Sequence, residues 1–303
     1  MRPIFLLAAY LLAVFGGGAL LAPWLYRLAQ WGAGHWTALA GLANNPFSRF
    51  VLRSMLGLAV LGLWPLLRGC GMLSGREMGL TKRGRPLRNL AVGFAIGFGS
   101  LAGAAGLAIL CGGRTAHVPH SQPELIHVLL GATATAGAVA LVEELIFRGA
   151  LFGILRKTLA WPAALAVSSA VYASVHFLQK TAAPQAIDWL SGIRLLPEMC
   201  RIPPDGLGLA PAFFTLFLAG AILALAYQRT GALFMSIGLH AGWVFCLAAY
   251  RALTQEASRA SRPIWGSDKL IDGWLPFFIM ALVLAGMWRT VPPAAGANSR
   301  GES

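Results

Sequence analysis

Charge, and acidic charge above all, is what this chain has little of. Only 12% of its 303 residues are Asp, Glu, Lys or Arg, while 57% are hydrophobic. Soluble globular domains carry about 25% charged residues, so the composition excludes an ordinary soluble domain and predicts a membrane protein. Of the charges present, 24 are basic and 11 acidic. The basic residues fall in loops between apolar segments, where membrane topology explains them, and no nucleic-acid partner is expected.

Cysteine motifs, sequence repeats and nucleotide-binding loops are also missing. The four cysteines, Cys70, Cys111, Cys200 and Cys246, show no CxxC or CxxH spacing. This excludes a recognisable zinc motif or disulfide framework, and we interpret the cysteines as small apolar side chains. No repeat of about 20 to 50 residues and no glycine-rich loop after a strand-like segment is visible, so neither a repeat architecture nor a phosphate-binding loop is predicted.

Long apolar segments are what the chain has in abundance. A bilayer crossing needs roughly 20 mainly apolar residues, and about eight such segments are present. The sequence therefore predicts an all-α polytopic membrane protein, with a single transmembrane domain over residues 1–303. The fourth segment is too long for one straight crossing and is expected to break, or to emerge from the bilayer, near Gly149 or Gly153. The predicted spans are Pro3 to Tyr26, Phe50 to Leu67, Leu87 to Cys111, Leu125 to Leu155, Trp161 to Phe177, Pro211 to Gln228, Gly231 to Tyr250 and Gly273 to Trp288.

The loops set the expected topology. Basic residues crowd the loop between the second and third spans, which the positive-inside rule places in the cytoplasm, and alternation then places both termini there. The basic residues between the last two spans run against this orientation. We expect a bacterial inner-membrane protein whose stretches 179–210 and 252–272 are surface connections with short interfacial helices, and whose residues 291–303 form a disordered tail. The basic residues of the second loop are Arg68, Arg76, Lys82, Arg83, Arg85 and Arg88.

The first span has a second interpretation. Arg2 precedes an apolar stretch that ends in small residues, which is also the pattern of a secretory signal peptide. Pro23 directly after Ala22 argues against cleavage there, although a cut after Ala19 stays open. Because seven further spans follow, we expect an uncleaved first span.

Many of the 36 glycines lie inside the predicted spans. Gly93 and Gly97, and likewise Gly99 and Gly103, are four residues apart on the third span. In lipid, small residues at this spacing allow two helix backbones to approach closely, so we expect these glycines to pack against neighbouring helices.

Two adjacent glutamates and an arginine interrupt the fourth span. Carboxylates inside a hydrophobic span cost several kcal/mol unless they are paired or used, so they indicate a functional site. Glu144 and Arg148 are four residues apart in the favourable order for an ion pair on one helix face. Glu143 is turned about 100° from Glu144, so it need not share Arg148 and can point into the bundle. By itself the ion pair could equally be a structural lock between helices.

Two histidines lie in later spans. His176 follows Tyr172 by four residues near the end of the fifth span, and His240 lies among apolar residues of the seventh. Alone, the first could be an interfacial histidine and the second a hydrogen-bonded interior one. Together with Glu143 and Glu144, they are expected to converge on one cavity. Such groups could activate a water and stabilise an oxyanion, hold a divalent metal, or relay protons in a transporter.

In order and spacing these residues resemble the three-motif signature of the CPBP intramembrane endopeptidases, which include the type II CAAX prenyl endopeptidases and Abi or bacteriocin-processing proteins. The motifs are Glu143-Glu144-x-x-x-Arg148, Tyr172-x-x-x-His176 and His240, within a core of about residues 125–250. The resemblance implies that Glu143 and His176 activate the hydrolytic water, that His240 stabilises the oxyanion, and that Glu144 and Arg148 form a structural pair. It also implies a membrane-associated peptide or protein substrate and no metal or other cofactor, although the residues alone would allow zinc.

Two positions depart from the family's pattern. Tyr172 stands where Phe is usual, and Val244 stands four residues after His240, where Asn or Asp is usual. Loss of an oxyanion-hole donor typically costs about 10²–10³ in rate. Either another donor substitutes, with the Trp243 indole, Ser174 or Tyr172 as candidates, or the chain hydrolyses slowly or not at all.

The sequence therefore predicts an intramembrane endopeptidase that uses a glutamate-activated water on a peptide bond, with the substrate admitted from the bilayer or its cytoplasmic side. Two alternatives stay open. One is a catalytically weakened relative that binds a membrane partner as an immunity or maturation factor. The other is a proton-coupled transporter that uses the same buried acid and histidines as a relay.

Overall fold

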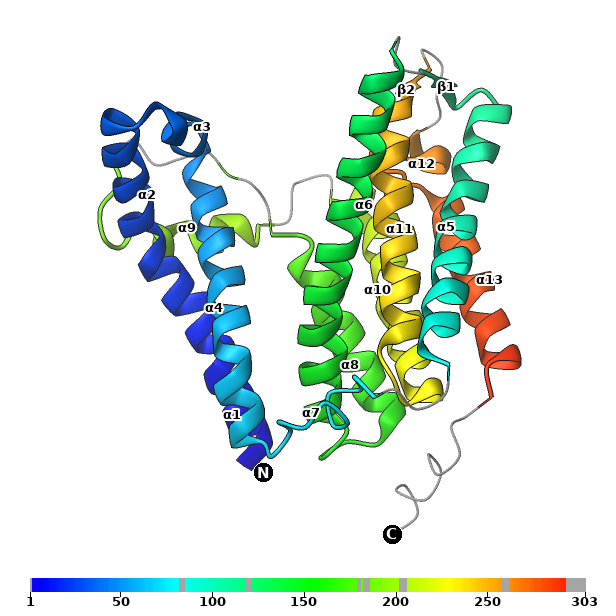
Figure 1. Cartoon of the computed structure of the whole chain (residues 1–303), viewed down its shortest axis with the longest axis horizontal. Coiled ribbons are helices and arrows are strands. Elements are labelled where there is room, and N and C mark those ends of the chain that lie inside the picture. Colours follow the sequence, from blue (N-terminus) through cyan, green and yellow to red (C-terminus); the bar gives the residue numbers. More distant parts are fainter. Residues whose placement is uncertain are drawn as a thin grey trace. The chain divides into compact units, whose positions relative to one another are not determined.

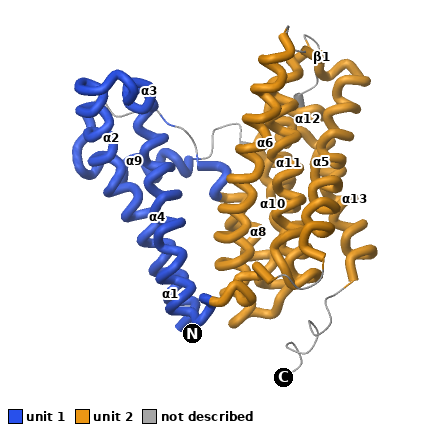
Figure 2. Tube along the Cα trace, viewed as in Figure 1, with its two compact units in different colours: residues 1–73, 175–204 blue, residues 74–174, 205–303 orange. Residues whose placement is uncertain are grey.

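The regular structure of the chain is almost entirely helical (Figure 1). The computed structural model describes residues 2–81, 85–117, 121–178, 181, 186–201, 206–257 and 262–292, so most of the predicted tail lies outside the described residues. The predicted all-α polytopic class is confirmed. Figure 2 shows two compact units, Met1–Leu73 with Val175–Pro204, and Ser74–Ser174 with Asp205–Ser303. That the whole chain forms one domain stays a prediction.

The first unit is built on one long helix and a second that packs against it. The long helix comprises α1 (Arg2–Leu12), a π-helical segment η1 (Ala13–Gly17) and α2 (Gly18–His35). A short connection formed by η2 (Thr37–Leu39) and α3 (Ala40–Ala43) leads to α4 (Phe47–Gly69), which packs on α2. The short helix α9 (Ser191–Met199) also packs on α2, and it lies within a stretch that was predicted to contain short helices.

The second unit carries the remaining helices around α11, which packs against α5, α6 and α10. Ser121 caps the start of α6, because its hydroxyl accepts a hydrogen bond from the Glu124 amide. Gly231 ends α10 in the left-handed conformation that favours glycine. The elements are α5 (Pro86–Leu110), β1 (Arg114–Ala116), α6 (Gln122–Glu144), η3 (Leu145–Phe152), α7 (Gly153–Leu155), α8 (Trp161–Val175), η4 (Gly206–Leu209), α10 (Ala210–Thr230), α11 (Phe234–Leu253), β2 (Thr254–Glu256), α12 (Arg262–Trp265) and α13 (Trp274–Thr290).

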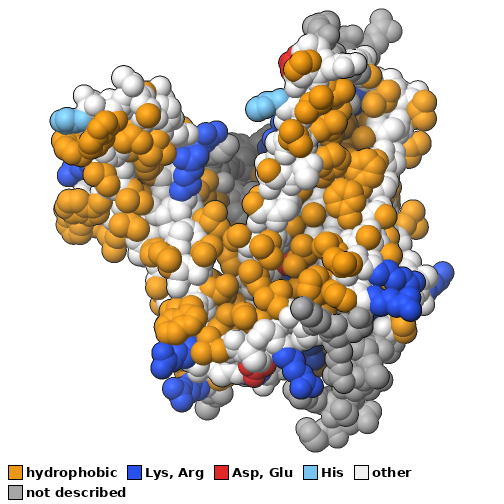
Figure 3. Space-filling model, viewed as in Figure 1, with side chains coloured by type: hydrophobic (Ala, Val, Ile, Leu, Met, Phe, Trp, Pro, Cys, Tyr) orange, Lys and Arg blue, Asp and Glu red, His pale blue; other side chains and the backbone are white. Residues whose placement is uncertain are grey.

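Each predicted span corresponds to a helix, and the first helix extends further than predicted. Among the described residues, five helices are long and apolar enough to cross a membrane, while α8 and α13 are shorter apolar helices. Large apolar side chains such as Leu61, Leu110 and Leu282 are exposed, and orange hydrophobic surface covers much of both units in Figure 3. Side chains of this kind suit contact with lipid tails, as expected of an integral membrane protein. The five long helices are Arg2–His35, Phe47–Gly69, Pro86–Leu110, Gln122–Leu155 and Ala210–Thr230.

The fourth span does not break near Gly149 or Gly153, and that it emerges from the bilayer there stays a prediction. Helical structure is continuous from Gln122 to Leu155, and the expected break is replaced by the π-helix η3. Gly149 lies inside this π-helix and Gly153 directly follows it. A π-helix is wider than an α-helix and is often found at functional sites, so a change of helix type takes up the extra residues here without interrupting the chain.

Glycines bring α5 and α11 into direct backbone contact. A Cβ atom added to Gly97 would meet the Leu239 carbonyl oxygen, and one added to Gly238 would meet the Leu90 carbonyl oxygen. The predicted close packing is confirmed for Gly93 and Gly97, whose faces lie against α11, and wrong for Gly99 and Gly103, beside which a Cβ would find open space. Gly238 and Gly242 of α11 complete the contact and flank His240 in the sequence.

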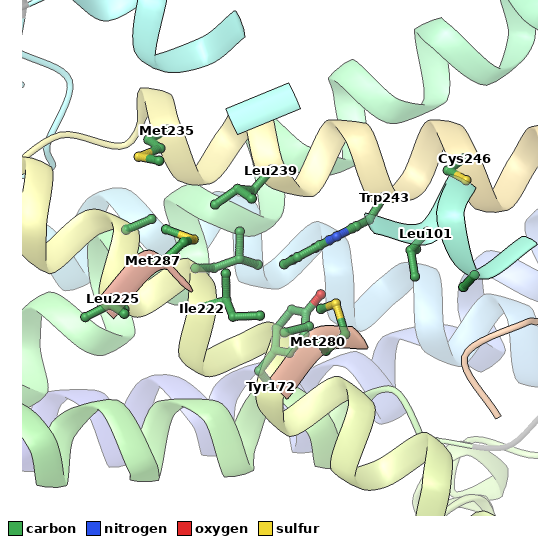
Figure 4. Close-up of a cluster of buried hydrophobic side chains, with 14 of the residues drawn as sticks. Leu101, Tyr172, Ile222, Leu225, Met235, Leu239, Trp243, Cys246, Met280 and Met287 are labelled. Carbon is green, nitrogen blue, oxygen red and sulfur yellow. The ribbon is translucent and has the colours of Figure 1, made fainter. Parts of the chain in front are cut away.

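The apolar core of the second unit lies between α5, α8, α10, α11 and α13. Figure 4 shows Trp243 and Leu239 of α11 pointing toward Ile222 of α10, with Tyr172 of α8 and Met280 of α13 beside them. A small antiparallel ribbon of β1 and β2 connects the ends of α5 and α11. Strands of three residues leave no readable periodicity, which is why the sequence did not predict them.

Candidate active site

The Glu144 carboxylate lies at the centre of the site. It is the last residue of α6 and is fully buried. Its Oε1 atom accepts a hydrogen bond from Arg148 Nη1 at 2.8 Å and lies 2.9 Å from His240 Nδ1. Its Oε2 atom is buried and has no hydrogen-bond partner among the described residues. One oxygen of Glu144 therefore joins a residue of its own helix to a histidine of α11.

His240 lies between the two neighbouring glutamates and is only 4% exposed. Its Nδ1 atom faces Glu144, and its Nε2 atom lies 3.7 Å from Glu143 Oε2. A carboxylate only accepts hydrogen bonds, so the tautomer that suits the contact with Glu144 has its proton on Nδ1. A singly protonated ring then presents an unprotonated Nε2 toward Glu143, and a doubly protonated ring presents an N–H there.

Glu143 is the accessible member of the glutamate pair. Its side chain is 25% exposed, whereas that of Glu144 is 0% exposed. The 3.7 Å between Glu143 Oε2 and His240 Nε2 is within ion-pair distance and exceeds a direct hydrogen bond. The two acids therefore differ in burial as well as in helix face.

Arg148 connects three helices through one guanidinium group. It lies on η3, is 2% exposed and pairs with Glu144. Its Nη2 atom donates to the Gly220 carbonyl on α10 at 3.4 Å, and its guanidinium carbon lies 4.5 Å from the ring centroid of Tyr172 on α8. The spacing of Glu144 and Arg148 predicts the ion pair, but the contacts with α8 and α10 depend on the tertiary packing.

Tyr172 forms one wall beside His240. Its side chain is 3% exposed, and its ring meets His240 edge-to-face with centroids 6.2 Å apart. A second edge-to-face contact joins it to Phe147 at 5.1 Å. These contacts use the aromatic ring rather than the hydroxyl, so a phenylalanine could make them equally well.

His176 and Ser174 occupy the end of α8 and the turn that follows. Ser174 is exposed on the last turn of the helix. His176 is the first residue after the helix and is exposed. It belongs to the first unit, through the segment Val175–Pro204, so its position beside Glu143 stays a prediction.

The indole N–H of Trp243 already donates a hydrogen bond within the protein. Its Nε1 atom donates to Ser100 Oγ at 3.0 Å, and that hydroxyl donates to the Gly97 carbonyl at 2.8 Å. In this structure the indole N–H of Trp243 is thus already used, and which of Trp243, Tyr172 and Ser174 replaces the missing oxyanion donor stays a prediction. The next residue, Val244, is half-buried on α11 and offers no donor.

The described residues offer no group of side chains placed to bind a metal ion. No three His, Cys, Asp or Glu side chains among them are placed to hold one metal ion. The four cysteines form no disulfide in this structure, and Cys70 and Cys246 are buried while Cys111 and Cys200 are exposed. The interpretation of the cysteines as small apolar side chains in the core therefore suits the buried Cys70 and Cys246 better than the exposed Cys111 and Cys200.

Sequence reasoning missed three components of the site. The Gly220 carbonyl that contacts Arg148 carries no side-chain signal, because every residue has a backbone carbonyl. Ser100 stands among apolar and glycine residues of α5, and nothing in its neighbourhood indicates that it binds Trp243. The π-helix η3 starts directly after Glu144, and only the excess length of the span pointed to an irregularity there.

Fold and site together define a polytopic membrane protein with a buried Glu–Arg–His cluster in an α-helical bundle. Residues 125–246 match the family model of the Rce1-like type II CAAX prenyl endopeptidases. Over that segment, the match confirms the resemblance to the CPBP intramembrane endopeptidases that the three motifs predicted. The segment contains every residue of the site from Glu143 to His240. Comparisons with curated proteins and with solved structures give no match.

Proposed function

We propose that this protein is an intramembrane endopeptidase that hydrolyses a peptide bond in a membrane-associated protein or peptide. The family match supports an endopeptidase in general. The observation that carries the proposal is the position of His240, with one ring nitrogen at Glu144 and the other facing Glu143. A carboxylate and an imidazole beside the same water can take its proton and hold the charge that develops on the substrate.

In the proposed reaction Glu143 is the general base, because it is the more accessible carboxylate of the pair. The water oxygen attacks the carbonyl carbon of the scissile bond while its proton passes to Glu143, and the carbonyl π electrons move onto oxygen. The C–N bond then breaks, and the leaving amine takes the proton from Glu143. Acid–base catalysis of this kind contributes about 10²–10⁴ in rate. His176 completes water activation in the proposal.

His240 is the proposed oxyanion donor, and its geometry sets a condition on its protonation. Because Nδ1 donates to Glu144, an N–H on Nε2 exists only when the ring carries both protons. In either state Glu144 accepts a hydrogen bond from the Nδ1–H group and keeps the ring oriented, as the acid does in a Ser-His-Asp triad. Arg148 in turn fixes Glu144, so this pair acts by positioning.

The proposal includes a location. We place the protein in a bacterial inner membrane with both termini in the cytoplasm, on the positive-inside argument. The substrate then reaches Glu143 from the bilayer or from its cytoplasmic side. A protease in this position acts on membrane-associated chains.

A second candidate function is a catalytically weakened relative that binds a membrane partner as an immunity or maturation factor. Two observations favour it. Val244 offers no hydrogen-bond donor where the family usually has Asn or Asp, and the neighbouring Trp243 indole is engaged with Ser100. An enzyme without that donor would be slower by about 10²–10³.

Substitutions at the two proposed catalytic groups separate these functions. Glu143→Gln and His240→Ala should abolish cleavage and cause cells to accumulate an uncleaved membrane peptide, detected by mass spectrometry of membranes. Glu124→Gln and His127→Ala are matched controls, because both residues are exposed near the start of α6. Unfolding midpoints of the purified variants verify the fold.

Each alternative has its own outcome in this experiment. Full cleavage by Glu143→Gln or His240→Ala would contradict the endopeptidase proposal. A binding factor would keep its biological activity in both variants. A proton-coupled transporter would show substrate flux in proteoliposomes that both substitutions stop.

A further inference from the structure

A second feature of the larger unit lies outside the candidate active site. A groove of about 620 Å³ runs between α8, α10 and α13. Its walls are apolar faces of the three helices, including Leu165 of α8, Leu218 and Leu225 of α10, and Leu284 of α13. None of the proposed catalytic residues lines it, so the proposed peptidase does not account for it.

One end of the groove is aromatic and basic. Trp161, the first residue of α8, stacks on Trp288 of α13 with ring centroids 5.9 Å apart. The guanidinium carbon of Arg229 lies 4.7 Å from the Trp288 ring centroid. Tryptophan and arginine at helix ends are typical of the membrane–water interface. The groove therefore extends from an interfacial end into the apolar part of the bundle.

The two arginines at this end differ in how they are used. Arg229 donates to the Val291 and Trp288 carbonyls at 2.9 and 3.4 Å, so its charge caps the end of α13. Arg289 lines the groove and is exposed, and it makes no ion pair or hydrogen bond with any described residue. None of the described residues that line the groove is Asp or Glu. The Arg289 guanidinium at this end of the apolar groove can therefore bind an anion.

We propose that this groove binds an anionic phospholipid, with an acyl chain along the apolar helix faces and the headgroup phosphate at Arg289. Basic pockets between transmembrane helices are known to select anionic headgroups. A guanidinium group suits phosphate because it can donate two parallel hydrogen bonds. A zwitterionic headgroup would place an extra cation beside Arg229 and Arg289, which explains the preference for net negative charge.

Binding is tested with the full-length protein after delipidation. Phosphatidylglycerol and phosphatidylcholine with identical acyl chains are titrated separately, and affinity is measured by native mass spectrometry and by the unfolding midpoint. A ligand that binds only the folded state raises the midpoint, so phosphatidylglycerol should raise it more than phosphatidylcholine. Arg289→Gln should weaken phosphatidylglycerol binding about fivefold and phosphatidylcholine binding less, so that the difference in affinity between the two lipids shrinks. Arg76→Gln, an exposed residue that does not line the groove, is the charge-matched control.

A second variant tests the acyl-chain part of the site. Ala285 lines the groove, so Ala285→Phe should fill it and weaken binding of both lipids. Leu282→Phe is the matched control, because Leu282 is 72% exposed and does not line the groove. Inorganic phosphate should not displace bound phosphatidylglycerol.

Any of three results in the tests of charge and headgroup would overturn the proposal. They are equal affinity of the unmodified protein for the two lipids, unchanged phosphatidylglycerol binding in Arg289→Gln, and full displacement of the lipid by inorganic phosphate. The last would indicate an anion site without an acyl-chain groove. Unchanged lipid binding in Ala285→Phe would likewise exclude the groove as the acyl-chain site.

Discussion

The Nδ1 atom of His240 lies 2.9 Å from Oε1 of Glu144, although the two residues are 96 positions apart in the chain. The same oxygen accepts a hydrogen bond from Arg148, so the predicted ion pair is part of a three-residue cluster. Within it, Glu144 orients the ring whose other nitrogen faces Glu143. The adjacent glutamates are thus distinct in burial and connected through one imidazole.

The buried Glu144 carboxylate contacts both the Arg148 guanidinium and the His240 ring. Glu144→Gln leaves the Arg148 guanidinium without its counter-charge, and removing one partner of a buried pair costs about 3–5 kcal/mol. We expect a loss of unfolding free energy in this range, measured by denaturant unfolding in detergent micelles. The double variant Glu144→Gln/Arg148→Met should recover a large part of it, because no unpaired charge remains. Strictly additive losses would show that the two side chains are not coupled.

The contact between α5 and α11 should determine the position of His240. Gly97→Ala places a methyl group against the Leu239 carbonyl, so α11 must move and His240 must move with it. We expect Gly97→Ala to lower the cleavage rate strongly while the protein remains folded. Gly99→Ala is the control on the same helix, since its methyl group would meet open space. Equal rates for the two variants would contradict this role of the close packing.

Val244 offers a test by gain of activity. Val244→Asn restores the residue that the CPBP pattern usually has four positions after His240. If the missing donor limits catalysis, the variant should cleave up to about 10²-fold faster, measured as kcat on a membrane peptide. Val244→Leu, which changes shape without adding a donor, should not accelerate cleavage. Identical rates for both variants would show that another group already stabilises the oxyanion.

Substitutions of Tyr172 can distinguish the function of its aromatic ring from that of its hydroxyl. Tyr172→Phe keeps the edge-to-face contact with His240 and the contact with the Arg148 guanidinium, and it removes the hydroxyl that is one candidate for the substitute donor. If the hydroxyl stabilises the oxyanion, kcat should fall about 10²-fold with KM little changed. If only the ring matters, Tyr172→Phe should cleave normally and Tyr172→Leu should be less stable. The comparison of kcat with the unfolding midpoint distinguishes the two.

Local geometry explains which contacts could be predicted. Glu144 and Arg148 are one helical turn apart, so their pairing follows from the spacing of a helix. Gly93 and Gly97 were rightly expected to permit close packing, but Gly99 and Gly103 have the same spacing and meet no neighbour. Spacing shows that a helix face is smooth, and it does not show which face another helix covers.

Contacts between distant segments could not be predicted in the same way. The bond from Trp243 to Ser100 joins α11 to α5, and it uses an indole N–H that the sequence alone left without an assigned partner. The bond from Arg148 to Gly220 uses a backbone carbonyl, which has no sequence signature. Both depend on the rotation of one helix against another, and periodicity within one segment does not fix that rotation.

The sequence by itself determined the helical membrane class, the approximate spans and the residues of the three motifs, because apolar length and helical spacing are local properties. Only the tertiary structure decided that His240 bridges the two glutamates, that span four continues through a π-helix, and that Arg289 faces an apolar groove. These features arise where separate helices meet. Their geometry depends on packing and on the satisfaction of buried polar groups across the whole bundle.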